Sequence, residues 1–332
     1  MSRGSVLITG AAGFLGSHLV DAYLRRGFLV IGVDNFFRGK PENLPKGCKD
    51  FIFVKLDLTS EDATELLSKY LREYSVNLVI HYAAINGTKY FYDIPYKVLD
   101  DNVRMTQNVL RATELAGCVR KVVYASSSEV YGEPSVIPTP ESHPIMLEVQ
   151  QRRDSYAASK ALGEFYVKLF SETHGIDYLI LRIFNTYGPR MDTSEYGQVI
   201  PELIRKLFFD EVFTIIGPGT QTRSFCYVDD HVRLVMKLVE KCRNDVFNVG
   251  SDEEVTILEL AKILHELVGR PFKPKILPPR PGDRMRRRPD ISKLIRAVDD
   301  KPRIGLREGL KLTINYYIKL WGICDKVSIK ED

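Results

Sequence analysis

Short apolar runs alternate along the chain with longer segments whose apolar residues recur every three or four positions. Continuous apolar runs of this length are typical of strands buried on both faces of a parallel sheet. They lie at residues 6–9, 28–33, 51–56, 78–84, 121–127, 177–184 and 246–249. Helical spacing predicts helices at 17–24, from 59–62 to about 74, at 99–116 and at 155–173. This alternation predicts an α/β protein with a doubly wound parallel sheet and helices on both faces.

Short stretches rich in proline and glycine become more frequent after residue 185. Three such stretches interrupt the pattern, at residues 188–189, 217–219 and 278–282. We therefore expect one domain at residues 1–185, to which the chain returns near 225–250. Residues 186–332 would mainly form a smaller C-terminal substrate-binding lobe, interleaved with that return. Within the lobe, Thr256 and Glu259 form a capping-box pattern that predicts the start of a helix.

Composition narrows the functional class. The 332 residues include 44% apolar and 27% charged residues, the balance of an ordinary globular protein. The net charge of +4 is too small to suggest a partner nucleic acid, and the arginine-rich run at 280–288 lacks the interleaved aromatic residues of such a surface. Five scattered cysteines without a Cys-x-x-Cys motif argue against disulfides and zinc, and six dispersed histidines argue against any metal site.

The same sequence features indicate where the protein resides. The chain enters its first predicted strand within a few residues, which leaves no room for a signal peptide, and no apolar run approaches the length of a membrane span. Scattered cysteines also suit a reducing compartment. We therefore expect a cytoplasmic protein without a membrane partner.

The turn after the first predicted strand has the pattern of an anion-binding site. Gly10, Gly13 and Gly16 follow the apolar run and open the first predicted helix. Glycines let the backbone approach a pyrophosphate closely, and the helix N-terminus offers N–H groups and the positive end of its dipole. The second predicted strand ends in Asp34, about 20 residues further on, where an acid binds ribose hydroxyls and repels a 2′-phosphate. These features predict a Rossmann-type fold that binds NAD rather than NADP.

Further cofactor contacts are expected where the other strands end. The loop after Asp34 passes the expected ribose, and a polar loop after the third strand lies where adenine would bind. Two small residues at the end of the fourth strand would allow a dinucleotide to approach closely. Besides the three glycines and Asp34, the predicted cofactor-binding residues are Phe14, Leu15, Asn35, Arg38, Asp57, Leu58, Ala83, Ala84, Tyr156 and Lys160.

Tyr156 and Lys160 are candidates for catalysis. They lie four positions apart in one predicted helix, so that their side chains share a face. A tyrosine is a poor base at neutral pH, because its pKa lies near ~10. The positive charges of Lys160 and of oxidised nicotinamide would lower that pKa and stabilise the phenolate. Ser127, at the end of the fifth predicted strand, would hold a substrate hydroxyl in line. Following a dinucleotide fingerprint, this set is interpreted as catalytic.

Six motifs make the chain resemble the extended short-chain dehydrogenase/reductases, and among them the nucleotide-sugar epimerase, dehydratase and decarboxylase group. They lie at residues 9–16, 33–37, 126–132, 156–160, 182–190 and 221–225. The resemblance implies a homodimer that pairs the helices predicted at 99–116 and 155–173. It also implies a nucleotide-sugar substrate, with UDP-sugars favoured, bound by Ser128, Asn185, Val199, Arg223, Arg280 and Arg287.

The resemblance further implies a first step shared by the group. Tyr156 takes the proton of the sugar 4-hydroxyl while hydride passes from C4 to NAD, which leaves a 4-keto sugar. The pair Ser128-Glu129 then discriminates between reactions, and it resembles that of the UDP-glucuronate decarboxylases, in which the C5 carboxylate leaves once C4 is a ketone. Glu129 would then handle a proton or water at C5 or C6. Mannose-type dehydratases share the Ser-Glu pair but favour NADP. Because Asp34 argues against NADP, it also argues against this group.

Other features leave further reactions open. The Tyr-x-x-x-Lys motif has its generic form, Gln198 stands where the decarboxylases usually have arginine, and residues 85–89 differ from their proline-rich loop. A nucleotide-sugar 4-epimerase needs no acid at position 129, whereas a 4,6-dehydratase would use Glu129 in losing the 6-hydroxyl. A non-catalytic NAD-binding regulator is a remote alternative, because the serine, tyrosine and lysine are all present.

Overall fold

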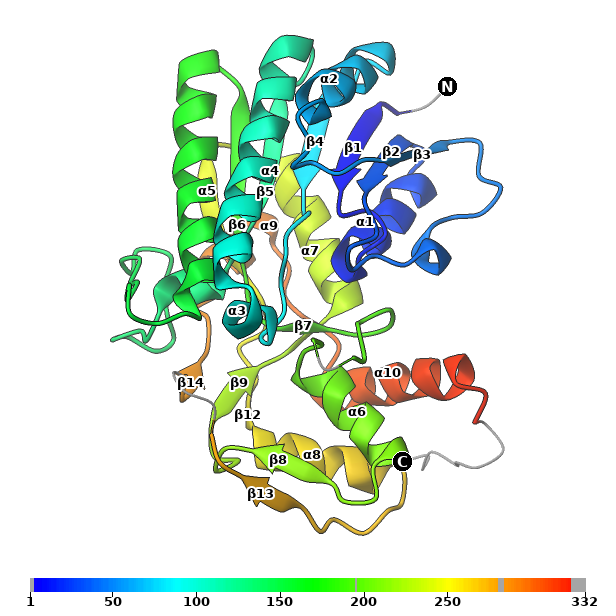
Figure 1. The fold of residues 1–332 in the computed structure, drawn as a ribbon, viewed down its shortest axis with the longest axis vertical. Coiled ribbons are helices and arrows are strands. Elements are labelled where there is room, and N and C mark those ends of the chain that lie inside the picture. Colours follow the sequence, from blue (N-terminus) through cyan, green and yellow to red (C-terminus); the bar gives the residue numbers. More distant parts are fainter. Residues whose placement is uncertain (1–2, 195, 280–283, 324–332) are drawn as a thin grey trace.

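The main part of the molecule is a seven-stranded parallel sheet with the order β11-β6-β5-β4-β1-β2-β3 (Figure 1). The computed structural model describes residues 3–194, 196–279 and 284–323. The expected doubly wound parallel sheet is confirmed. Its strands are β1 (Ser5–Thr9), β2 (Leu29–Asp34), β3 (Phe51–Lys55), β4 (Leu78–His81), β5 (Lys121–Ser127), β6 (Asp177–Ile183) and β11 (Asp245–Val249).

Helices cover both faces of this sheet. Those on one face are α2 (Ala63–Glu73), α4 (Pro95–Ala116) and α5 (Asp154–His174). Those on the other are α1 (Phe14–Arg25), α7 (Val228–Lys241) and α9 (Ser292–Val298). Successive residues of a strand point to opposite faces. Accordingly Val6 and Ile8 belong to the core beneath α1 and α7, and Leu7 belongs to the core beneath α2 and α4.

The strand order reverses between β1 and β4. From β1 the chain proceeds to β2 and β3 on one side, and from β4 to β5 and β6 on the other. Ligands of open α/β sheets bind in the crevice at the carboxyl ends of the strands flanking such a point. Gly10 follows β1, Ala83 lies just after β4, and Ser127 ends β5. The sheet therefore brings the predicted glycine turn and the predicted catalytic serine to one edge.

A smaller part lies below the sheet in Figure 1. Its helices are α6 (Val199–Phe209), α8 (Ile257–Leu267) and α10 (Leu306–Leu320). Three small sheets, β10-β7, β12-β9-β14 and β13-β8, accompany them. Their strands are β7 (Thr186–Tyr187), β8 (Thr214–Ile216), β9 (Thr222–Ser224), β10 (Cys226–Tyr227), β12 (Glu254–Thr256), β13 (Lys275–Leu277) and β14 (Arg286–Arg287). The predicted capping box is present, because Thr256 and Glu259 exchange side-chain-to-backbone hydrogen bonds at 3.1 and 3.0 Å.

Several predicted boundaries were wrong by a few residues. α1 begins at Phe14 rather than at residue 17. α2 begins at Ala63 rather than at 59–62, because Thr59 is held in a turn by the Asp57 carboxylate, 2.8 Å from its N–H. α4 begins at Pro95 instead of residue 99, since proline is tolerated in the first turn of a helix. β4 ends at His81, and residues 82–84 leave the sheet beside the glycine turn.

Short elements complete the chain: α3 (Tyr90–Asp93) and the 3-10 turns Pro41–Asn43 and Ser128–Tyr131. Within the described ranges, no helix is long and apolar enough to cross a membrane. In that same part of the chain, no three His, Cys, Asp or Glu side chains gather in a way that could hold a metal ion. The described cysteines, Cys48, Cys118, Cys226 and Cys242, are free thiols.

Candidate active site

The turn between β1 and α1 is so tight that there is no room for a side chain at Gly10 or Gly16. The Gly13 N–H donates to the Gly10 carbonyl at 3.0 Å, and Gly10 has φ +69°, in the left-handed region that favours glycine. A Cβ on Gly10 would lie 2.9 Å from the Ala83 nitrogen, and one on Gly16 would overlap the Gly10 carbonyl. The first turn of α1 lines the adjoining cavity. This cradle of bare backbone at a helix N-terminus fits the pyrophosphate of a dinucleotide.

Asp34, the last residue of β2, is held beside the glycine turn. Its carboxylate accepts hydrogen bonds from the N–H groups of Ala12 at 3.0 Å and Phe36 at 2.8 Å. Burial raises the pKa of this carboxyl, although the two N–H groups oppose the shift. Asp34 therefore holds both the glycine turn and the loop that follows β2. It also lines the cavity where the ribose of NAD is expected.

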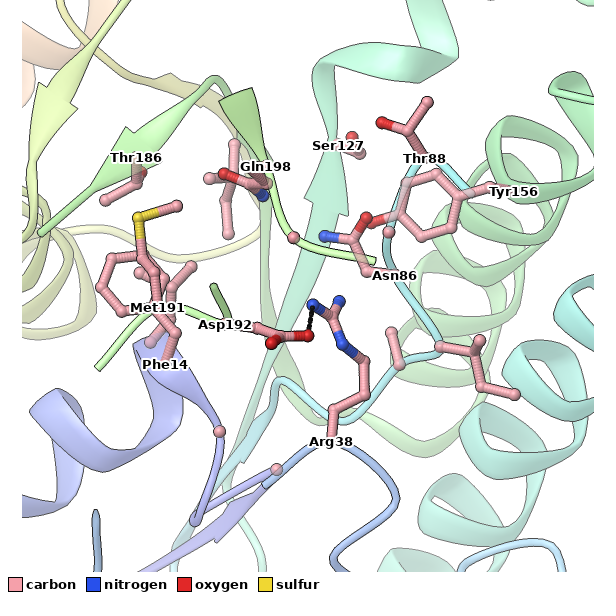
Figure 2. Close-up of a pocket in the computed structure, with 18 of the residues that line it drawn as sticks. Phe14, Arg38, Asn86, Thr88, Ser127, Tyr156, Thr186, Met191, Asp192 and Gln198 are labelled. Carbon is pink, nitrogen blue, oxygen red and sulfur yellow. Dashed lines mark hydrogen bonds and ion pairs between the residues drawn. The ribbon is translucent and has the colours of Figure 1, made fainter. Parts of the chain in front are cut away.

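Ser127, Tyr156 and Lys160 meet at the carboxyl end of β5. Ser127 and Tyr156 line the same part of the cavity (Figure 2), and the ring of Tyr156 stacks on Phe91 with centroids 4.7 Å apart. Lys160 lies one turn further along α5 and donates from Nζ to the Ala125 carbonyl at 2.7 Å. All three predicted catalytic side chains line the same cavity. Two hydroxyls are thus presented together where a substrate hydroxyl would bind.

Burial dominates the electrostatics of this set. It raises the pKa of the Tyr156 phenol, an effect that the neighbouring Ser127 hydroxyl reduces, and it lowers the pKa of the Lys160 amine to about 7. The expected lowering of the tyrosine pKa is therefore not achieved by the side chains of this protein alone.

The carboxylate of Glu129 lies between two buried guanidinium groups. Arg153 Nη2 donates to Oε1 at 2.9 Å, and Arg287 Nη2 donates to Oε2 at 3.1 Å. Burial opposes ionisation, but the two positive charges outweigh it and hold the pKa of Glu129 well below its usual range. Two guanidinium groups and one carboxylate thus lie together in the cavity wall. Glu129 is therefore ionised, has no proton to donate and is a weak base.

Sequence reasoning missed Arg153. The arginine lies directly before α5 and is only 6% exposed. It lies three positions before Tyr156, a spacing that places two side chains on one face of a helix. An arginine at that spacing from the predicted catalytic tyrosine was the available signal. The adjacent Asp154 accepts a hydrogen bond from Arg284 at 3.0 Å, which fastens the start of α5 to the segment carrying Arg287.

The residues expected to hold the substrate line the cavity both at the end of the sheet and on the smaller part of the molecule. Asn185 donates to the Ser224 carbonyl at 3.3 Å, and Arg223 donates to the Arg284 carbonyl at 2.7 Å. Ser128 begins the turn after β5, and Val199 begins α6. These side chains are positioned by the smaller part of the molecule and by the end of the sheet. Arg280, also expected to bind substrate, lies outside the described residues.

One cavity of about 410 Å³ brings these predicted residues together. It extends from the loops after β2 and β3 to α6 and β8, where Lys206 pairs with Glu202 at 2.9 Å. Neither of these two residues was singled out from the sequence. The predicted residues that line the cavity are Gly10, Gly13, Phe14, Leu15, Gly16, Asp34, Asn35, Arg38, Asp57, Leu58, Ala83, Ala84, Ser127, Ser128, Glu129, Tyr156, Lys160, Asn185, Val199, Arg223 and Arg287.

Comparison with known proteins identifies the family. Residues 6–250 match the model of the NAD dependent epimerase/dehydratase family. The chain belongs to this family. Family membership agrees with the resemblance stated from the motifs and with the glycine turn and Asp34. The protein is therefore an enzyme that uses NAD as its cofactor.

Relatives of this epimerase/dehydratase family member cover nearly its whole length. It is 36% identical to UDP-glucuronic acid decarboxylase 6 of Arabidopsis thaliana over 94% of this chain and 88% of that protein. A UDP-glucose 4-epimerase of Thermotoga maritima, solved with UDP-glucose, superposes with a TM-score of 0.88 at 32% identity, over 96% of this chain and 99% of that one. The UDP-glucose 4-epimerase of Thermus thermophilus in complex with NAD gives 0.85 at 31% identity, over 94% and 98%.

Proposed function

We propose that this enzyme converts a nucleotide sugar through a 4-keto intermediate, and that it is a UDP-glucuronate decarboxylase. The observation that carries the choice of reaction is the cluster of Glu129 between Arg153 and Arg287. It places two guanidinium groups in the wall of the cavity that also contains Ser127 and Tyr156. A sugar that bears a carboxylate at C5 can pair with a guanidinium group, and an uncharged hexose does not need one. The similarity to UDP-glucuronic acid decarboxylases supports the same choice.

The side chains of the site suit the proposed steps. Tyr156, with Ser127 beside it, takes the proton of the 4-hydroxyl, and Lys160 lies on the same face of α5. NAD, when bound, accepts hydride from C4 and later returns it. Once C4 is a ketone, the bond between C5 and its carboxylate breaks, and its electron pair moves onto the C4 oxygen as carbon dioxide leaves. A proton from water then takes the place of the carboxylate on C5 before C4 is reduced. Glu129 is ionised and has no proton to donate, so it is our candidate for orienting that water at C5.

The substrate is proposed to lie between the sheet and the smaller part of the molecule. Ser128 and Arg287 would contact the sugar, and Asn185, Val199 and Arg223 would contact the nucleotide and its phosphates, together with Arg280. The division into an NAD-binding domain at 1–185 and a substrate lobe at 186–332 is part of this proposal. Its support is that the cavity lies between the two.

A 4-epimerase is the second candidate. The observation that favours it is Gln198 at the start of α6, in the cavity wall where the resemblance to decarboxylases leads us to expect arginine. The similarity to a UDP-glucose 4-epimerase points the same way. The two reactions differ in mass balance, since epimerisation conserves the mass of the sugar.

Incubation with single nucleotide sugars tests the proposal. The purified protein, without added cofactor, is incubated with UDP-glucuronate or UDP-glucose, and the masses of the products are measured by mass spectrometry. We expect UDP-glucuronate to lose the mass of carbon dioxide and UDP-glucose to remain unchanged. Conversion of UDP-glucose to an isomer of different chromatographic mobility, with UDP-glucuronate unchanged, would establish the epimerase instead.

A homodimer is proposed through α4 and α5. The side chains of Leu162, Phe165 and Leu169 on α5 are 44%, 59% and 56% exposed, and their spacing puts them on one stripe. A contiguous apolar surface of this kind marks an interaction site. Analytical ultracentrifugation should show a dimer that Phe165→Glu dissociates, whereas Phe209→Glu, at an exposed site on α6, leaves the dimer intact.

A cytoplasmic location is also proposed. It is supported by the free cysteines, which suit a reducing compartment.

A further inference from the structure

Three loops from distant parts of the sequence meet over the cavity. They follow β2, β4 and β7, and they carry Arg38, Gly87 and Asp192. Figure 2 shows Arg38 reaching toward Asp192 across the cavity. Arg38 Nη2 donates to Asp192 Oδ2 at 3.3 Å and to the Tyr196 carbonyl at 3.4 Å. An ion pair therefore joins the loop beside the ribose-binding Asp34 to the segment that leads into α6.

Aromatic rings reinforce this link. The rings of Tyr90 and Tyr196 stack with centroids 4.3 Å apart and an angle of 23° between their planes, and Phe37 packs on Tyr90 at 5.5 Å. The Tyr196 hydroxyl donates to Asp93 at 3.3 Å, and the Lys89 ammonium lies 4.7 Å from the centre of the Tyr196 ring. The segment after β7 is thus fastened to both other loops by contacts between side chains.

The inner and outer sides of this link differ. Arg38, Gly87 and Asp192 line the cavity, whereas the rings of Tyr90 and Tyr196 are not among the described residues that do so. Gly87 has φ +151°, and a Cβ there would lie 2.6 Å from the Tyr196 carbonyl. The two backbones are therefore in direct contact, and the rings lock them together from outside. The locked loops form a wall of the same cavity that contains the glycine turn.

We propose that Arg38, Tyr90, Asp192 and Tyr196 form a clasp that keeps NAD in its cavity between turnovers. The proposal rests on the proposed function to this extent: an enzyme that returns hydride in every cycle has no need to exchange its cofactor. Opening the clasp costs an ion pair and an aromatic stack, and this cost slows the release of NAD. Tyr90 and Tyr196 act through the loops they join, so they are positioning residues rather than direct contacts of the cofactor.

Release of NAD from the loaded protein tests the clasp without any turnover. Wild type, Tyr196→Ala and Tyr196→Phe are saturated with NAD and passed through a desalting column, and the NAD that remains bound is measured over time. Loss of the stack should speed release by severalfold to about tenfold in Tyr196→Ala. Tyr196→Phe keeps the stack and should release NAD at nearly the wild-type rate.

Further variants test the two halves of the clasp one at a time. Tyr90→Ala removes the same stack from the other side, so the double variant Tyr90→Ala/Tyr196→Ala should release NAD little faster than either single variant.

Thermal unfolding identifies any variant that fails to fold, and Asp192→Asn then tests the ion pair instead. Wild-type release rates in folded Tyr196→Ala and Tyr90→Ala would overturn the proposal. Loss of the ion pair in Asp192→Asn should speed release as Arg38→Ala does. Faster release in Arg38→Ala together with wild-type release in Asp192→Asn would also overturn the proposal, because that result indicates a direct contact of Arg38 with the cofactor. None of these rates depends on which sugar the enzyme converts.

Discussion

Arg223 and Arg287 are register partners across the parallel strands β9 and β14, yet their guanidinium groups serve different acceptors. Arg223 donates to a backbone carbonyl, at Arg284, and Arg287 donates to the carboxylate of Glu129. Like charges on neighbouring strands are unfavourable unless each is compensated. Here each has its own partner. The Arg287 guanidinium, which lies beside the end of β5, therefore comes from the smaller part of the molecule. The strand pair that positions it is far from β5 in the sequence.

Glu129→Gln tests whether this carboxylate acts after the first oxidation. Glutamine keeps the shape and removes the charge, so a step that needs the carboxylate should slow by about 10²-fold or more. Removal of a group that is used only in the later step leaves the earlier one intact. With substrate, we expect the absorbance of reduced nicotinamide to build up in Glu129→Gln. Tyr156→Phe, which blocks the first step, should show no such band. Unchanged turnover of Glu129→Gln would favour the epimerase.

Arg287→Gln tests recognition of a carboxylate on the sugar. Loss of one positive charge from the cluster should weaken the binding of UDP-glucuronate by about tenfold, equal to about 1.4 kcal/mol, with a much smaller effect on UDP-glucose. Titration calorimetry measures both affinities. Arg286→Gln is the matched control, because Arg286 is half-exposed and pairs with Glu254 on the surface. Equal losses of affinity for both sugars would show that Arg287 binds the nucleotide part instead.

The buried amine of Lys160 predicts an unusual dependence of stability on pH. Its pKa is lowered by burial to about 7, from 10.5. Between these values the unfolded chain binds a proton that the folded chain does not, so stability rises with pH in this window. Below pH 7 both states are protonated, and the burial penalty is fully present. The gain stops as pH approaches 10.

Lys160→Met removes this titration. The free energy of unfolding of wild type relative to Lys160→Met should therefore increase between about pH 7 and pH 9, by up to about 1.4 kcal/mol per pH unit. Urea unfolding of both NAD-free proteins at several pH values measures the difference. Parallel pH profiles of the two proteins would mean that the lysine keeps its ordinary pKa.

Gly10 and Gly27 offer a matched pair for the glycine turn. Both have positive φ, +69° and +77°, but a Cβ would collide with the Ala83 backbone at Gly10 and meet nothing within 4 Å at Gly27. Gly27→Ala should cost about 1–2 kcal/mol of stability from backbone strain alone. Gly10→Ala should cost more and should also lower the NAD retained after desalting. Thermal unfolding and NAD content separate the two effects. Equal NAD content in both variants would argue against the turn as the pyrophosphate site.

Local patterns made much of this structure predictable. The glycine turn, Asp34 and the pair Tyr156 and Lys160 each depend on spacing within a single strand-turn-helix unit or helix. The apolar runs fix the strands because a buried parallel strand tolerates little else. Boundaries were predicted less well: α4 starts at Pro95, and a proline at the first position of a helix is a start signal that the apolar spacing alone did not use.

The charge cluster was not predictable in the same way. Glu129 and Arg287 are far apart in the chain and meet only because β14 pairs with β9 beside the end of the sheet. Sequence alone assigned Arg287 to the substrate and Glu129 to chemistry, with nothing to indicate that they bind each other. Arg38 is a similar case, since its partner Asp192 belongs to a loop of the other half of the chain.

The last strand of the large sheet has a consequence for how this protein is made. β11 closes the outer edge of β6, yet α6 and β8 to β10 are synthesised between the two strands. While the nascent chain emerges, β6 therefore presents an open row of backbone hydrogen-bonding groups beside apolar side chains such as Leu179 and Leu181. Such an edge is a template for pairing with another chain. Until residue 249 has left the ribosome, β11 is not available to cover this edge, and β6 can pair with a strand of another chain.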